Sequence, residues 1–240
     1  MQFHEETTRM NWYLQKTIKK WEPELNQVLE KLSNNRHWQA LPYHTIAINR
    51  MLGGSIDDSA CLAAVFKLFL LSDHFHSLIQ DDSEGQQYNE ALQFNILIGD
   101  LLDGSAVCLL CEKGWDSLLP VIANMIVQIN EGHALANEAS NLDVIQLATR
   151  EWGSYYRVAF RSAAILSNLS PDLEKKLDTI GLDLGLLMTA EAMGWDNAGI
   201  FSSRYREGMD WLTSNLSINN NFKRIDTWMA DAGVPVPAAG

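Results

Sequence analysis

Two adjacent carboxylates, Asp81 and Asp82, close a long apolar run, Cys61–Gln80, that has the character of a helix. The C-terminal end of a helix carries partial negative charge, so acids there cost up to ~1 kcal/mol and Lys or Arg is the expected residue type. The pair therefore predicts a polyvalent cation or a partner that offsets the repulsion. A solvated helix end leading into the polar loop from Ser83 to Gln87 is the alternative.

Other side chains suggest chemistry less directly. Asp100 and Asp103 share a helix face, and Asp100 lies in an apolar stretch, so it either lines a cavity or bonds to a neighbouring helix. Cys108 and Cys111 have no further Cys or His partner nearby, which favours two buried small apolar residues over a metal or redox pair. His74 and His76 lie on different faces of their helix, so packing or surface roles are favoured for both.

The composition narrows the class of protein. The chain has 240 residues, 47% of them hydrophobic and 20% charged, with few Gly and Pro, which favours an all-helical protein with one sizeable core. Its net charge of −12 argues against nucleic acid and anionic lipid as partners. Three cysteines make no disulfide framework, the first twenty residues are too polar for a secretory signal, and no uninterrupted apolar run is long enough for a membrane span. We expect a soluble, cytoplasmic protein.

The elements that would hold these side chains are long helices. No polar stretch is long enough to be an interdomain linker, so residues 1–240 are expected to form a single domain, a bundle of long helices with a frayed tail over 233–240. The apolar periodicity and the Gly, Ser and Pro positions predict helices over Trp12–Leu32 (interrupted by Pro23), Ser55–Asp82, Tyr88–Lys113, Trp115–Glu131, Leu142–Leu169, Leu173–Trp195, Ser202–Ser214 and Phe222–Ala232.

Five short segments occur in an order typical of one family. They are Leu71–Asp82, Asn95–Leu102, Glu131–Ala136, Tyr155–Ala163 and Gly181–Met188. Together they resemble, in order, the H-x-x-S-L-I-H-D-D-x-x-D, L-A-G-D-x-L, G-E-x-x-Q, K-T-A and G-x-x-L-G-x-A-F blocks of the trans-prenyl diphosphate synthases. Each match is weak alone, and their common order carries the resemblance.

The resemblance implies a helical bundle around a deep apolar cavity, as in other isoprenoid synthases. Family enzymes condense an allylic diphosphate with isopentenyl diphosphate, using two aspartate clusters that hold Mg²⁺ against the leaving diphosphate. On this chain the first cluster falls on Asp81 and Asp82. His74, Asp100 and Arg161 become candidates for contact with the cavity or the diphosphate.

The departures from the family pattern are as informative as the matches. The last aspartate of the first motif is replaced by Gly85. Glu84 is a candidate substitute ligand, although it does not occupy the family's position. The second aspartate pair falls on Ala192 and Met193, and only the final acid, Asp196, is retained. The early G-K-x-x-R-P motif and the R-R-G-x-P loop, which supply cations for isopentenyl diphosphate, are missing. Mg²⁺ binding at Asp81, Asp82, Glu84 and Asp196 is therefore partial or vestigial.

Three functions remain open. The leading hypothesis is a non-catalytic or modulating subunit of a heteromeric trans-prenyl diphosphate synthase, paired with a homologous catalytic subunit or with itself as a dimer. The second is a terpene synthase-like enzyme that ionises an allylic diphosphate with a reduced Mg²⁺ site. The third is a carrier of an isoprenoid or other lipid.

Overall fold

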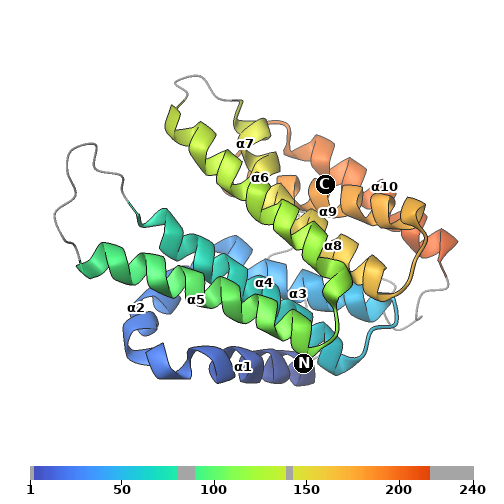
Figure 1. The fold of residues 1–240 in the computed structure, drawn as a ribbon. Coiled ribbons are helices and arrows are strands. Elements are labelled where there is room, and N and C mark those ends of the chain that lie inside the picture. Colours follow the sequence, from blue (N-terminus) through green and yellow to red (C-terminus); the bar gives the residue numbers. More distant parts are fainter. Residues whose placement is uncertain (1–2, 80–89, 139–142, 217–240) are drawn as a thin grey trace.

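The computed structural model describes residues 3–79, 90–138 and 143–216, and these residues are all-helical, as the sequence predicts. The helices form a bundle of mostly long rods (Figure 1). They are α1 (His4–Ile18), η1 (Lys19–Trp21), α2 (Glu22–Leu32), α3 (Arg36–Met51), α4 (Ile56–Ser77), α5 (Glu90–Glu112), η2 (Asp116–Leu118), α6 (Leu119–Glu138), α7 (Val144–Arg150), α8 (Trp152–Leu166), α9 (Pro171–Met193) and α10 (Ala198–Asn215).

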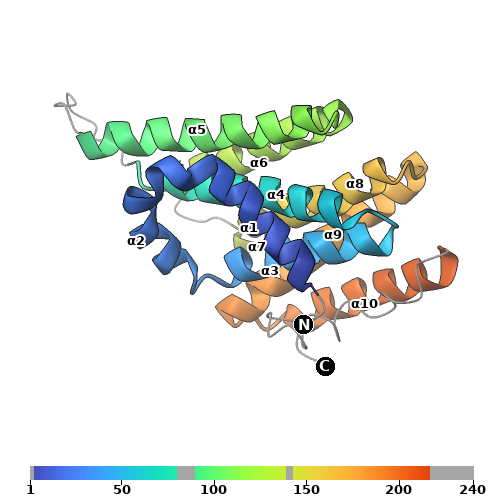
Figure 2. The ribbon, with the colours of Figure 1, turned by 90° about the horizontal axis from the view of Figure 1, so that it is seen from below.

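The described helices pack in two groups that follow the order of the chain. In the first group α4 contacts α1, α3 and α5, and in the second group α9 contacts α8 and α10. The groups meet where α3 packs on α8, and α6 also packs on α8. Figure 2 shows the result, with α5 along one edge of the bundle and α10 along the opposite edge.

Helix α4 is the core helix of the first group. Between Ser59 and Ser72 every side chain except that of Lys67 is buried. A helix that is apolar on all sides has no polar face to turn to water, so it is stable only inside a bundle. Ser55 begins the helix as predicted, because its side chain accepts a hydrogen bond from the backbone N–H of Asp58.

The contact between α8 and α9 depends on glycine. A Cβ atom at Gly181 would lie 2.5 Å from the backbone oxygen of Tyr156, and one at Gly185 would lie 3.1 Å from the Cα of Gly153. The missing side chains let the two backbones approach closely. These glycines belong to the Gly181–Met188 segment that carries part of the family resemblance.

The predicted end of α4 at Asp82 is wrong, because the helix ends at Ser77. The backbone N–H groups of Leu78 and Ile79 bond to the carbonyls of Phe75 and His76, three residues back, which tightens and closes the last turn. Asp81 and Asp82, which the prediction placed in the last turn of this helix, lie outside the described residues.

Two other predicted helices are divided. The run over Trp12–Leu32 becomes α1, η1 and α2, and α2 begins with a proline in its first turn, where the missing N–H costs nothing. The run over Leu142–Leu169 breaks at Glu151, whose ψ of −94° is not helical, and gives α7 and α8. Helix α6 continues past Gly132 to Glu138, and the prediction over Phe222–Ala232 lies outside the described residues.

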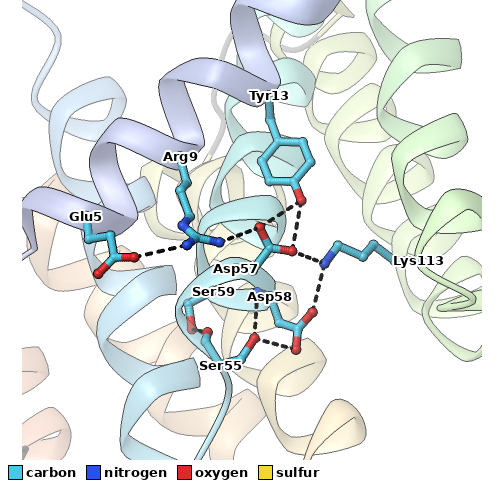
Figure 3. Close-up of polar contacts among 8 residues, drawn as sticks. All are labelled: Glu5, Arg9, Tyr13, Ser55, Asp57, Asp58, Ser59 and Lys113. Carbon is cyan, nitrogen blue, oxygen red and sulfur yellow. Dashed lines mark hydrogen bonds and ion pairs between the residues drawn. The ribbon is translucent and has the colours of Figure 1, made fainter.

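An ion cluster fixes α1 and α5 to the start of α4 (Figure 3). The Asp57 carboxylate accepts hydrogen bonds from Lys113 (2.6 Å), from the Tyr13 hydroxyl (3.0 Å) and from Arg9 (3.3 Å). Lys113 also reaches Asp58 at 2.9 Å. The hydrogen bond from Lys113 lowers the pKa of Asp57, and burial followed by the bond to Asp57 raises the pKa of Tyr13 to about 12. The cluster therefore joins three helices at one end of the bundle.

Candidate functional site at the polar end of the bundle

One end of the bundle, which we call the polar end, gathers the groups most suited to chemistry. Here α4, α6 and α9 finish and α3 and α8 begin. Two contacts define it: Arg36 at the start of α3 forms an ion pair with Glu191 near the end of α9, and His133 near the end of α6 faces residues of α4 and of the α7–α8 junction. The Asp57 cluster lies at the other end of α4, ~30 Å away by helix rise.

His133 lies between two carboxylates from different helices. Its Nδ1 is 3.7 Å from Asp73 Oδ1 of α4, and its Nε2 is 3.7 Å from Glu151 Oε1 at the α7–α8 junction. Burial raises the pKa of both acids, and His133 partly offsets this effect. Gly132 makes the approach possible, because a Cβ there would lie 3.1 Å from the Cγ of Glu151. We call Asp73, His133 and Glu151 the acid–histidine triad.

A small cavity lies about one helical turn deeper than the triad. It has a volume of about 30 Å³, room for roughly two water molecules. Two carboxyl groups line the cavity, those of Asp73 and Asp103, and burial raises the pKa of both. The Tyr155 hydroxyl, also in the lining, donates a hydrogen bond to the backbone carbonyl of Phe69 at 3.3 Å. The cavity is large enough to hold water beside these two carboxyl groups. Its lining residues are Phe69, Ser72, Asp73, His76, Asp103, Met125, Ile126, Ile129, Asn130 and Tyr155.

A second polar group lies where α3 meets α8 and α9. The His37 ring stacks on Trp152 with 4.0 Å between centroids and 7° between planes. Its Nδ1 is 3.3 Å from the Tyr156 hydroxyl and its Nε2 is 3.4 Å from the Thr189 hydroxyl. Burial lowers the pKa of His37 to about 3, so the ring is neutral at pH 7. It offers hydrogen bonds here but no positive charge.

The predicted metal ligands are not brought together by the described residues. Asp81, Asp82 and Glu84 lie outside them, and Asp196 is exposed just beyond the end of α9. Over residues 3–79, 90–138 and 143–216, no three His, Cys, Asp or Glu side chains are close enough to hold a metal ion. This part of the chain does not fit a Mg²⁺ cluster, and no step through Mg²⁺ can be derived from it.

The three cavity or diphosphate candidates are separated in the fold. Asp100 is largely exposed and lies 3.4 Å from His76 at the edge of the cavity. His74 lies on the other side of α4, where partial burial followed by the charge of Lys31 lowers its pKa. Arg161 lies 3.7 Å from Glu174 in the first turn of α9, away from the polar end. The two histidines of α4 thus face different neighbours, as their spacing predicts.

The triad was not predicted as a site. Asp73 could have been found, because an acid inside the apolar run of α4 needs a partner once it is buried. His133 and Glu151 could not, since they are far from Asp73 in the sequence and only the packing of α6 and α8 against α4 brings them near it.

Helix α5 presents an exposed stripe of apolar and small residues, which we call the α5 seam: Leu97, Leu101, Gly104, Cys108 and Cys111. The steps of four and three residues give the 3.5-residue period of a helix–helix contact. The two cysteines were predicted to be buried, and that was wrong, because the seam faces away from α4. Among the described helices α5 alone is long and apolar enough to cross a membrane, which is weak evidence because a buried core helix passes the same test.

Comparisons with known proteins support the fold. No protein-family model matches the sequence, and no curated protein matches it. A decaprenyl diphosphate synthase from Rhodobacter capsulatus is 18% identical over 76% of this chain, with a TM-score of 0.64, and the chain spans 60% of that enzyme's length.

Two plant structures match over almost their whole length. A deletion mutant of heterotetrameric geranyl pyrophosphate synthase from mint is 16% identical, with 92% of this chain and 95% of that chain covered and a TM-score of 0.66. The small subunit of geranyl diphosphate synthase from Antirrhinum majus is 15% identical, with 93% and 99% covered and a TM-score of 0.58. The chain therefore has the all-helical fold of the trans-prenyl diphosphate synthases.

Proposed function

We propose that this chain is a non-catalytic or modulating subunit of a heteromeric trans-prenyl diphosphate synthase. It pairs with a catalytic homologue and supports that subunit or alters the length of its product. The proposal is supported by the fold and by the chemistry of the polar end. In the family that the sequence resembles, this end of the bundle holds the metal ions and both diphosphates.

The observation that carries the proposal is the loss of charge at the end of α9. Ala192 and Met193 stand where the resemblance places the second aspartate pair, and both are exposed, Met193 by 68%. An exposed position in the last turn accepts an acid without any loss of packing. Packing therefore does not explain why these two residues are uncharged, which supports the loss of the second aspartate pair.

The start of α3 supports the same conclusion for the second diphosphate. Trp38 and Leu41, from the segment where the missing G-K-x-x-R-P motif would fall, are packed into the core. Arg36 is already paired with Glu191, and His37 is neutral at pH 7. This segment presents no free cation to a second diphosphate.

The α5 seam supplies a surface for the partner. Leu97 is 67% exposed and Leu101 is 40% exposed, and the seam itself carries no charged side chain. Beside its first half lies an apolar groove of about 330 Å³ between Trp21 and the side chains of Phe94, Leu97, Ile98 and Leu101. A helix with matching apolar spacing, such as the corresponding helix of a homologous subunit, would cover both. The matches to a heterotetrameric enzyme and to a small subunit favour this occupant.

The activity test uses the full chain alone and together with the catalytic homologue from the same source. Each preparation is assayed with Mg²⁺, an allylic diphosphate and isopentenyl diphosphate. We expect no turnover by the isolated chain, and a change in rate or product length when it joins the homologue. Turnover by the isolated chain that disappears in Asp81→Ala would refute the proposal and favour the terpene synthase-like enzyme.

The partner surface is tested separately. Leu97→Lys places a charge in the α5 seam, whereas Ile200→Lys places the same charge on α10 at a residue of similar exposure, 60%. We expect Leu97→Lys to weaken co-purification with the homologue at least tenfold and Ile200→Lys to leave it unchanged. Equal effects of the two variants would contradict docking along α5. An isoprenoid that co-purifies with a chain unable to bind any homologue would favour the carrier.

A further inference from the structure

Two thiols lie one helical turn apart on the uncovered face of α5. Cys108 and Cys111 are both exposed, whereas the third cysteine of the chain, Cys61, is buried in α4. Residues three apart share a helix face, and both cysteines belong to the C-terminal half of the α5 seam. An exposed thiol is open to reaction, whereas a buried one is inert. The pair therefore forms an accessible dithiol on the surface that we assign to a partner.

The spacing of the two thiols allows a disulfide between them, at the cost of some strain. Helix geometry separates the Cα atoms of residues three apart by about 5 Å, inside the range of about 4.4–6.8 Å that disulfides tolerate. The Cβ atoms on such a helix are about 5–6 Å apart, whereas a disulfide holds them at about 3.8 Å. Closing the bond between Cys108 and Cys111 therefore requires this turn of α5 to tighten.

The place of the pair at the end of α5 makes this tightening possible. Cys111 is the last residue but one of the helix, so no further helical turn holds it from above. The chain leaves the helix at Gly114, whose φ of +67° suits glycine and whose N–H donates to the carbonyl of Cys111 at 3.0 Å. Exposed or strained disulfides are the ones that are readily reduced again. A bond between these two sulfurs is therefore reversible and not a permanent cross-link.

We propose that Cys108 and Cys111 form a dithiol site that a small disulfide of the glutathione class oxidises to an intrahelical disulfide, and that this bond weakens docking along the α5 seam. One cysteine thiolate attacks the small disulfide, which gives a mixed disulfide and releases one small thiol. The second cysteine then attacks the protein sulfur of the mixed disulfide and releases the other small thiol. The two electrons and two protons lost by the cysteines thus end on the two released thiols.

The disulfide changes the part of the seam that a partner contacts. Lys113, two residues after Cys111, is fixed to Asp57 of α4 at 2.6 Å, so this end of α5 is anchored from behind (Figure 3). Tightening the turn between Cys108 and Cys111 against this anchor disturbs the 3.5-residue spacing that a partner helix requires. A docked partner covers both thiols, so the small disulfide reaches only the free chain. The effect on docking rests on the proposed function, whereas closure of the disulfide does not.

Closure of the disulfide is tested on the full chain alone. The folded protein is incubated with oxidised glutathione, and its accessible thiols are then counted by alkylation and located by peptide mass. We expect two accessible thiols before oxidation, none after it, an internal disulfide in the tryptic peptide that ends at Lys113, and full recovery with dithiothreitol. Cys108→Ser is the control, since its remaining Cys111 should keep glutathione. A lasting glutathione adduct on the wild type, or a disulfide between two chains, would overturn the proposal.

The effect on docking is tested with the catalytic homologue. Its affinity is measured for the reduced and oxidised wild type and for the double variant Cys108→Ser, Cys111→Ser after the same two treatments. We expect oxidation to weaken binding about fivefold in the wild type, as for lost contacts at the end of an interface, and to leave the double variant unchanged. Equal binding of the reduced and oxidised wild type refutes the regulatory role and leaves the proposed function intact. A reduced chain that binds no homologue refutes both, while the thiol count still decides whether the disulfide forms.

Discussion

The two buried histidines of α3 should make the protein sensitive to mild acid. His37 and His44 are both buried, and desolvation lowers their pKa values to about 3 and about 4. In the unfolded chain both would titrate near the ordinary histidine value of ~6.5. The unfolded state therefore binds more protons than the folded state below that pH, and stability is lost as pH falls from about 6.5 toward the folded values.

The size of the loss follows from these pKa values. Between pH 7 and pH 5 each histidine contributes a loss of about 2 kcal/mol, or about 4 kcal/mol for the pair. A typical domain has only ~5–15 kcal/mol of stability, so the effect is large. The Nδ1 of His44 donates to the backbone carbonyl of Ala40 at 2.9 Å. Its buried Nε2 has no hydrogen-bond partner among the described residues.

The assay is urea unfolding of the wild type and of His44→Gln at pH 7, 6 and 5. The variant removes one titrating group, so its loss between pH 7 and pH 5 should be about 2 kcal/mol smaller than that of the wild type. Comparing the two losses cancels the contributions of all other titrating groups, including the triad. Equal losses in the two proteins would show that burial does not hold His44 neutral, and the reasoning would fail.

The remaining predictions concern packing, charge and thiols. Asp57→Asn should lower the free energy of unfolding by about 1 kcal/mol, and by less at high salt, because the ion pairs that it breaks are half-exposed. The control is Asp116→Asn at an exposed residue, which should have no effect in the same urea titration. Gly181→Ala should destabilise the protein by about 2–3 kcal/mol, because the added Cβ clashes with α8. Gly104→Ala should stabilise it by about 0.5–1 kcal/mol, because a Cβ there meets nothing within 4 Å. A loss of stability in Gly104→Ala would contradict the open seam. A thiol reagent at pH 8 should modify the two exposed α5 cysteines rapidly and Cys61 only in denaturant. The reason is that burial raises the pKa of Cys61 to about 12. Rapid labelling of all three cysteines would contradict the packing of α4.

Much of the fold could be predicted from the sequence because its causes are local. The cap at Ser55 and the Pro171 that opens α9 follow from short-range chemistry, whereas α3 (Arg36–Met51) was not among the predicted helices. The end of α4 and the break at Glu151 could not be predicted in the same way. Both occur inside runs with continuous apolar spacing, where tertiary packing decides which turn is the last.

The site was less predictable than the fold. The acids singled out first, Asp81 and Asp82, were chosen for their position at a helix end, and α4 ends before them. The acid–histidine triad depends on three segments that meet only in the folded chain. The cysteines of the α5 seam show the same limit: an apolar neighbourhood in the sequence does not reveal whether a helix face is covered by the chain itself or left uncovered.

The grouping of helices by chain order has a consequence for synthesis on the ribosome. Helix α4 finds its neighbours α1, α3 and α5 within the first half of the chain, so this group can assemble before α8 and α9 have been made. A helix as apolar as α4 would otherwise wait unprotected while the second half of the chain emerges, and exposed apolar surface of this kind promotes aggregation. Early pairing of near neighbours along the chain also favours rapid folding. The order of the helices thus limits how long the nascent chain depends on chaperones to cover α4.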